Sequence, residues 1–255
     1  MAPQTLPPLA LAYHGVADVP LRRDLGGLFV RPGDLQRQIE RLRQWGYRLV
    51  TFGELAQAAA QGRAAGLAAL TFDDGLVDNH ETLVPLLRAE GIPATVFVVS
   101  GWLGRTYPWG PWTRLMTADE VVDVHRAGVE IGAHTVTHPD LGTLSREGAF
   151  SELARSRADL AEILGAPVDV ASYPFGVAGP DTLAACADAG FRAACRTSGE
   201  GSWAEPLNLP RQAMTNRGSM AALWLKRDDR YEPLMRYRPV RLARRLVRKV
   251  RATAG

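Results

Sequence analysis

The chain has 255 residues and a formal net charge of +3. Its hydrophobic content of 46% and charged content of 22% are typical of a globular protein with a sizeable core and exclude a disordered or collagen-like chain. Cys186 and Cys195 are the only cysteines, which excludes a disulfide scaffold and predicts two buried thiols. The sequence has neither a secretory signal pattern nor an apolar run of about 18 residues, so it predicts a cytoplasmic protein.

Short apolar runs alternate with amphipathic segments along most of the chain. The predicted strands are Leu9–Tyr13, Tyr47–Val50, Ala68–Phe72, Ala94–Val99, Val129–Ala133, Val168–Ala171 and Arg192–Cys195. The predicted helices are Pro32–Trp45, Phe52–Gln61, Val77–Glu90, Thr117–Ala127, Ser145–Leu164, Pro180–Ala189 and Ser219–Lys226. Strands that alternate with helices form a parallel sheet. The pattern therefore predicts an α/β protein with a single (β/α) barrel within residues 1–235.

Residues 236–255 differ in charge from the rest of the chain. Residues 1–235 contain 22 basic and 27 acidic groups, a formal charge of −5, whereas the last segment contains eight basic groups and no acidic one. Leu242, Leu246 and Val250 have helical spacing there and predict a basic amphipathic tail. Such a tail favours an anionic membrane surface, here the inner face, or glycan-assembly partners. A solvated tail and nucleic-acid contact are the alternatives, and we expect no nucleic-acid partner.

Two adjacent carboxylates end one predicted strand. Asp73 and Asp74 follow Ala68–Phe72 and precede Gly75, and the carboxyl ends of barrel strands face the active site. Adjacent carboxylates repel each other and lose hydration when they are buried, unless a positive group lies between them. The alternative is a turn in which one Asp caps the next helix.

A histidine pair ends another predicted strand. His134 and His138 follow Val129–Ala133 and precede Pro139. Two His and one carboxylate can bind zinc and leave a position open for water. A lone His pair is often structural, but the Asp pair at another strand end favours a metal site, because catalytic groups gather on that face of a barrel.

The two motifs resemble the first two motifs of the polysaccharide deacetylases, the NodB-homology group or carbohydrate esterase family 4. Pro93–Val98 resembles the strand after the first motif, and Tyr173-Pro174-Phe175-Gly176 resembles the third motif. The resemblance covers about residues 9–212. It implies an incomplete, seven-stranded barrel of the NodB type.

The resemblance also implies a role for each matching residue. Asp74, His134 and His138 are the expected metal ligands, with Zn²⁺ as the metal, and Asp73 is the expected general base. The backbone N–H of Phe175 is expected to stabilise the tetrahedral oxyanion. The implied reaction removes an acetyl group from an N-acetylated sugar of a polysaccharide or glycan precursor and gives an amine and acetate.

The sequence departs from the family pattern at two places. Ser172 stands where the third motif usually has an Arg that orients the base. No His follows His138, so the C-terminal Leu-x-His motif, which supplies the general acid, is missing.

Two other residues are candidates to fill these roles. His14 ends the strand Leu9–Tyr13 and is the candidate general acid, because Tyr13-His14 resembles the N-terminal Tyr-His of the permuted biofilm poly-N-acetylglucosamine deacetylases. Arg211 is the candidate replacement for the missing Arg, through a contact with Asp73. A structural His and a surface Arg are the respective alternatives.

The segment Gly101–Arg114 is rich in aromatic residues. Trp102, Trp109 and Trp112 follow a predicted barrel strand, on the side where active sites lie. We expect them, with Tyr173 of the third motif, to bind the substrate through their aromatic faces. A hydrophobic lid that packs on its own barrel is the alternative for the Trp segment.

Two other functions fit the same fold. An O-acetyl esterase would use the same metal chemistry, and a catalytically inactive carbohydrate-binding protein would explain the departures at Ser172 and at the C-terminus. The retained set Asp73, Asp74, His134 and His138 favours an enzyme. Adjacent carboxylates are costly to keep without a cation.

Overall fold

The computed structural model describes residues 6–197, 200–215 and 220–228. The chain divides into two compact units, residues 1–217 and 218–255. In the second unit, the described residues form the helix α7, Met220–Arg227, close to the prediction for 219–226. The predicted basic tail, residues 236–255, lies outside the described residues.

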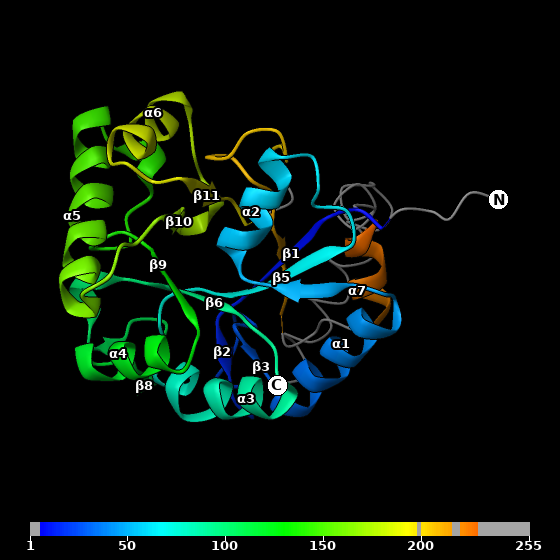
Figure 1. Cartoon of the computed structure of the whole chain (residues 1–255). Coiled ribbons are helices and arrows are strands. Elements are labelled where there is room, and N and C mark those ends of the chain that lie inside the picture. Colours follow the sequence, from blue (N-terminus) through cyan, green and yellow to red (C-terminus); the bar gives the residue numbers. More distant parts are fainter. Residues whose placement is uncertain (1–5, 198–199, 216–219, 229–255) are drawn as a thin grey trace, which may run out of the picture. The chain divides into compact units, whose positions relative to one another are not determined.

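A curled parallel sheet forms the centre of the first unit (Figure 1). Seven strands lie side by side in the order β11-β10-β9-β6-β5-β1-β12. Their bounds are β1 Leu9–Tyr13, β5 Leu67–Phe72, β6 Thr95–Val98, β9 Glu130–Ala133, β10 Val170–Ser172, β11 Ala193–Cys195 and β12 Gln212–Ala213. An eighth strand, β4 (Arg48–Val50), pairs with the first half of β5, and β6 pairs with the second half. The predicted incomplete seven-stranded barrel is confirmed.

The segment that ends in β12 connects the two edges of the sheet, β11 and β1. Leu209 forms a parallel bridge with Cys195 at the end of β11. A few residues later, Gln212 and Ala213 pair with Leu11 and Ala12 of β1. We call residues 209–213 the seam segment. Because it joins one edge of the sheet to the other, it brings its own side chains into the barrel.

Helices surround the sheet in the places that the sequence predicts (Figure 1). Their bounds are α1 Pro32–Gln44, α2 Phe52–Ala60, α3 Val84–Glu90, α4 Ala118–Arg126, α5 Arg146–Leu164 and α6 Pro180–Asp188. Thr51 and Thr117 form capping boxes at the starts of α2 and α4, which confirms the predicted box of α4. The apolar stripe of α1, at Leu35, Ile39 and Leu42, is buried as its spacing predicts.

Helix α2 covers the amino-terminal end of the barrel. The backbone N–H of Phe52, its first residue, donates to Thr95 Oγ1 at 2.8 Å, and the N–H of Gly53 donates to the carboxylate of Glu130 at 3.0 Å. Thr95 and Glu130 are the first residues of β6 and β9. Phe52 and Leu55 are buried against the strands. This end of the barrel is therefore filled by side chains, and the other end is left for chemistry.

Several short elements differ from the predictions. The single helix predicted over Val77–Glu90 begins with a π-helical turn, Asn79–Leu83, before α3. Pro85 has no backbone N–H, so an unbroken α-helical ladder cannot continue through it. The aromatic segment forms a hairpin of β7 (Thr106–Tyr107) and β8 (Gly110–Arg114). The two-residue strands β2 (Gly15–Val16) and β3 (Phe29–Val30) are also additions.

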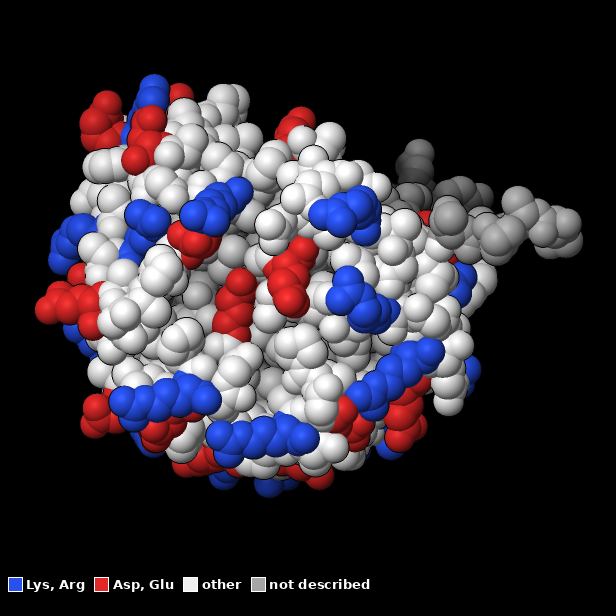
Figure 2. Space-filling view, viewed as in Figure 1, with Lys and Arg blue, Asp and Glu red and all other residues white. Residues whose placement is uncertain are grey.

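Charged side chains are interspersed on the described surface that Figure 2 shows, with Lys and Arg next to Asp and Glu. No described helix is long and apolar enough to cross a membrane.

Candidate active site

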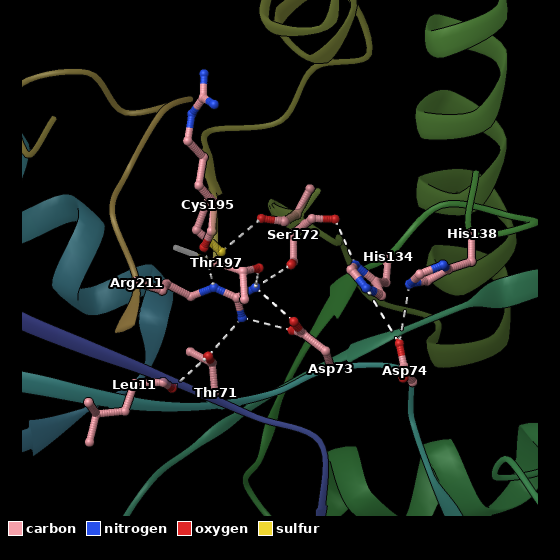
Figure 3. A network of polar contacts seen from close by, with 12 residues as sticks. Leu11, Thr71, Asp73, Asp74, His134, His138, Ser172, Cys195, Thr197 and Arg211 are labelled. Atoms are coloured by element: carbon pink, nitrogen blue, oxygen red, sulfur yellow. Dashed lines mark hydrogen bonds and ion pairs between the residues drawn. The ribbon is translucent and has the colours of Figure 1, made fainter. Parts of the chain in front are cut away.

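The candidate residues converge because the strands that precede them are parallel neighbours. Asp73 and Asp74 follow β5, His134 follows β9, and His14 follows β1. Asp73, Asp74, His134 and His138 form one cluster (Figure 3). The carboxyl ends of parallel strands meet at one edge, so residues far apart in sequence meet in space.

Asp74 lies between the two histidines. Its Oδ1 is 3.5 Å from His134 Nε2 and 3.5 Å from His138 Nε2. The three side chains can each offer one ligand atom within 4.8 Å of the others. All three residues are buried, and Asp74 Oδ1 has no hydrogen-bond partner. A buried carboxylate oxygen without a donor is costly, and a cation at this point would satisfy it.

The orientation of both histidines suits a cation. His134 Nδ1 is 2.8 Å from the carbonyl oxygen of Ser172, which can only accept, so Nδ1 donates and Nε2 is the nitrogen that faces Asp74. Burial lowers the pKa of His138 to about 4, so this ring is neutral at physiological pH. Two imidazoles and one carboxylate are a donor set that zinc accepts. The residues present fit a zinc ion.

Tyr107 completes the surroundings of Asp74. Its buried hydroxyl donates to Asp74 Oδ2 at 2.6 Å. Burial, and then the charge of Asp74, raise the pKa of Tyr107 above its usual range, so the hydroxyl keeps its proton. Tyr107 is a functional residue that the sequence does not single out, because nothing in its local sequence indicates a contact with a residue 33 positions away.

Asp73 has a different partner. Arg211 Nη1 and Nη2 donate to Asp73 Oδ1 and Oδ2 at 2.7 and 2.8 Å, a two-pronged pairing. Burial alone would raise the pKa of Asp73, but the Arg211 guanidinium holds it well below its usual range. Asp73 is therefore ionised at neutral pH.

The seam segment presents Arg211 to Asp73. The guanidinium also donates to Ser172 Oγ at 2.6 Å, to Thr71 Oγ1 at 2.8 Å and to Thr197 Oγ1 at 3.1 Å. Arg211 is 0% exposed, so it is not a surface Arg. Ser172, at the position where the family pattern has Arg, is one of the acceptors that orient it (Figure 3).

Backbone strain is concentrated at the cluster. Among the described residues, the non-glycine positions with positive φ are Asp74 at 74°, Thr135 at 67°, His138 at 55° and Phe175 at 58°. Such conformations cost roughly 1–3 kcal/mol each and persist where surrounding contacts impose them. The strain marks the turns that aim the candidate ligands and the Phe175 peptide.

Glu152 imposes the turn between the two histidines. Its carboxylate accepts from the N–H of Val136 and of Thr137, each at 2.9 Å, and from Thr137 Oγ1 at 2.8 Å. Inside the turn, the N–H of His138 donates to Thr135 Oγ1 at 3.0 Å. The sequence does not single out Glu152, because it is one of several acidic residues on the long helix α5.

His14 is held by its backbone. Its carbonyl oxygen accepts from Asn79 Nδ2 at 3.1 Å, and Asp78 accepts from the N–H of Val16. The side chain faces the pocket, and its Nδ1 is buried without a partner. Asp78 and Asn79 therefore fix the backbone at His14 and just after it.

These groups line a cavity of about 260 Å³. Its lining residues are His14, Leu28, Asp73, Asp74, Tyr107, Trp109, His134, His138, Phe175 and Thr197. The cavity lining therefore combines charged groups with apolar rings, as an active site for a small polar group requires.

The four predicted substrate-binding aromatic residues occupy different places. Trp109 lines the cavity, and Trp102 stacks on the His138 ring at 5.4 Å between centroids. Trp112 packs against Phe29 instead, at 4.9 Å. Tyr173 is 0% exposed and donates its hydroxyl to the carbonyl oxygen of Leu207, so it has no surface for a substrate to contact.

Comparisons with known proteins match this chain to polysaccharide deacetylases. The sequence model of a family described as "Polysaccharide deacetylase" matches residues 61–194, just over half of the chain. YxkH of Bacillus subtilis (strain 168), a protein named for that family, is 25% identical over 184 residues, which are 71% of this chain and 61% of YxkH. The chitooligosaccharide deacetylase of Sinorhizobium fredii (strain NBRC 101917 / NGR234) is 31% identical over 148 residues, which are 57% of this chain and 63% of that enzyme.

A solved structure shows the same fold. The deacetylase PplD of Streptococcus pyogenes, in complex with acetate, superposes with a TM-score of 0.74 over 87% of this chain and 99% of that chain, at 24% identity. The chain spans less than two thirds of the length of the curated relatives that it matches.

Proposed function

Because this chain belongs to the polysaccharide deacetylase family, we propose that it is a metal-dependent hydrolase of N-acetylated sugars in a polysaccharide or glycan precursor. Water adds to the acetamide carbonyl, the C–N bond breaks, and the products are acetate and an amine on the sugar. The observation that carries the proposal is the buried, unpartnered Asp74 Oδ1 between the Nε2 atoms of His134 and His138.

Asp74, His134 and His138 would hold the metal, and this donor set favours Zn²⁺. When bound, zinc would supply Lewis-acid chemistry that makes water more acidic and polarises a carbonyl. The chain contributes two imidazole rings and a fixed carboxylate. Their burial under Trp102 and Trp109 excludes bulk water from that side.

Asp73 is the general base in this proposal. It is ionised, and its orientation is fixed by both arms of the Arg211 guanidinium. A carboxylate held in place by a cation can take a proton from the attacking water without rotating away. Arg211 acts through Asp73 and is a positioning residue.

His14 would give a proton to the leaving nitrogen. It lies in the same cavity as Asp73, and Asn79 fixes its backbone. Phe175 borders the cavity in a strained conformation, and its N–H is the proposed donor to the oxyanion that forms at the former carbonyl.

The relatives and the cavity support the proposed substrate class. The relative from Sinorhizobium fredii is named for chitooligosaccharides, which are N-acetylated sugars. Trp109 and Phe175 supply apolar rings at the cavity, on which the C–H face of a sugar or an acetyl methyl group can pack. The basic tail 236–255 would bind an anionic membrane surface or a glycan-assembly partner, as its eight basic residues suggest.

The test is acetate release from a panel of N-acetylated and O-acetylated sugars by zinc-loaded protein, with and without a chelator. We expect chelator-sensitive release from N-acetylated sugars. Release from O-acetylated sugars alone would make the protein an esterase. Stoichiometric zinc binding without release from any substrate would favour the carbohydrate-binding alternative.

A further inference from the structure

The β7–β8 hairpin reaches the metal-binding cluster through one polar atom. Tyr107, at the end of β7, has its hydroxyl 2.6 Å from Asp74 Oδ2. A carboxylate has only acceptors, so the hydroxyl donates. Of the two carboxylate oxygens, Oδ2 is thereby occupied and Oδ1 has no partner. Oδ1 is also the oxygen that faces His134 and His138.

Tyr107 is held rigidly. Its ring is buried in a cluster with Phe29, Leu76 and Leu115. The backbone of this region is tied to the turn that bears Asp74, because the N–H of Met116 donates to the carbonyl oxygen of Gly75 at 2.9 Å. A donor in a packed ring, attached to the same turn as its acceptor, cannot easily follow the carboxylate if it rotates.

The carboxylate of Asp74 could bind a cation through one oxygen or through both. Two-oxygen binding would need Oδ2 to turn toward the histidines, and the hydrogen bond from Tyr107 opposes that rotation. A hydrogen bond to a charged acceptor is stronger than one between neutral groups. The bond therefore suffices to favour one orientation of the side chain.

We propose that Tyr107 is a positioning residue of the metal centre, which reserves Asp74 Oδ1 as the single oxygen ligand and makes the β7–β8 hairpin part of the site. The inference rests on the proposed metal-dependent function. It also gives the hairpin a role beyond binding the substrate through aromatic faces. The ring of Trp109, in the same hairpin, packs edge-on against Tyr107 and His138, so the hairpin contacts both Asp74 and a second candidate ligand.

Tyr107→Phe removes the hydroxyl and keeps the ring, so the packed cluster stays filled. Partners of metal ligands typically contribute 10- to 100-fold in metal affinity. We expect the zinc dissociation constant of Tyr107→Phe to rise by about that factor. We also expect a change in the visible absorption spectrum of the Co²⁺-substituted protein, because a two-oxygen Asp74 raises the coordination number.

Tyr47→Phe is the matched control. The buried Tyr47 also donates its hydroxyl, to the carbonyl oxygen of Pro7 at 3.0 Å, and it precedes β4, away from the catalytic end. The experiment is a competition titration of the full chain with Zn²⁺ and a chromophoric chelator, followed by Co²⁺ spectra. Thermal unfolding of both apo variants verifies that they are folded.

The outcomes separate this inference from the proposed function. Weaker zinc binding and an altered Co²⁺ spectrum in Tyr107→Phe alone support the inference. Wild-type affinity and an unchanged spectrum in Tyr107→Phe overturn the role of Tyr107 and leave the metal centre intact. A wild-type chain that binds neither Zn²⁺ nor Co²⁺ overturns both.

Discussion

Asp73 and Asp74 are neighbours in the chain and opposites in their surroundings. Both are buried at the end of β5. Asp73 has both oxygens paired with Arg211, a cation of the protein itself. Asp74 has one oxygen paired with Tyr107 and one oxygen without a partner.

The difference shows that segments distant in the sequence determine which partners each carboxylate has. Asp74 has a φ of 74°, and its carboxylate faces His134 and His138 instead of Arg211. Arg211 is 138 residues from Asp73, and His134 is 60 positions beyond Asp74. Arg211 neutralises Asp73, whereas Asp74 Oδ1 has no partner and can accept an external cation. Substitutions can remove either arrangement or test the residues around it.

Asp74→Asn should have the largest effect. The amide cannot neutralise the cation, so we expect loss of stoichiometric zinc and a fall in kcat/KM of about 10³-fold or more, since a metal supplies several kcal/mol of transition-state stabilisation. Elemental analysis and acetate release measure both. Asp140→Asn, which alters a carboxylate in the turn after the second His, is the control. Full zinc content in Asp74→Asn would contradict the assignment of the ligands.

Arg211→Met should break the other side. It leaves a buried carboxylate without its guanidinium partner, which costs about 3–5 kcal/mol of the free energy of unfolding. It also raises the pKa of Asp73, because the main charge that opposes the effect of burial is removed. Urea unfolding measures the loss. The double variant Arg211→Met/Asp73→Asn should recover much of it. Equal stability of the single and double variants would show that Asp73 does not need its partner.

The pH dependence of that loss has a definite sign. In the wild type the pKa of Asp73 is lowered, so the stabilisation is complete above the unfolded-state value of about 3.9 and is lost as the pH falls below it. In Arg211→Met the pKa is raised, so the variant becomes less stable as the pH rises through and above that value. The difference in unfolding free energy should therefore grow between about pH 4 and pH 7.

His14→Ala should separate chemistry from metal binding. We expect kcat to fall roughly 10²-fold, the lower part of the range for general acid catalysis, with zinc content unchanged. His125→Ala, on α4, is the control. Unchanged turnover in His14→Ala would remove His14 from the mechanism, and zinc loss would make it a ligand.

Glu152→Ala should have the smallest effect. The turn between His134 and His138 loses three hydrogen bonds to a partly exposed carboxylate, and we expect zinc affinity to fall about tenfold, equivalent to about 1.4 kcal/mol. Glu147→Ala, an exposed acidic residue on the first turn of the same helix, is the matched control. Equal zinc affinity in the two variants would show that the turn holds its shape without Glu152.

Hydrophobic periodicity was sufficient to predict the long elements and the barrel. The runs at β1, β5 and β6 are buried along their length, and β9 is buried after its first residue. The capping box at Thr117 marks a true helix start. The two-residue strands are too short to carry a periodic signal, and the β7–β8 hairpin has no continuous apolar run, so neither could be predicted. Their pairing depends on where the larger sheet places them.

The site shows a similar boundary. The Asp pair and the His pair could be found because their residue types and positions at strand ends are unusual. Tyr107 and Glu152 could not, because a Tyr in a turn and a Glu on a helix are common, and their roles come from contacts across the fold. For Tyr173 the sequence predicted too much. Its motif suggested contact with the substrate, whereas its side chain is buried in the interior.

The seam segment has a consequence for biosynthesis. Residues 209–213 hold the last strand of the described sheet and the partner of Asp73. A ribosome adds about 5–20 residues each second, so β1, β5 and β9 leave it several seconds before Arg211. Until then the barrel is open along one side and Asp73 lacks its counter-charge. The growing chain therefore reaches its stable form only after Arg211 has left the ribosome, and a product cut short before Arg211 would be marked by its own instability.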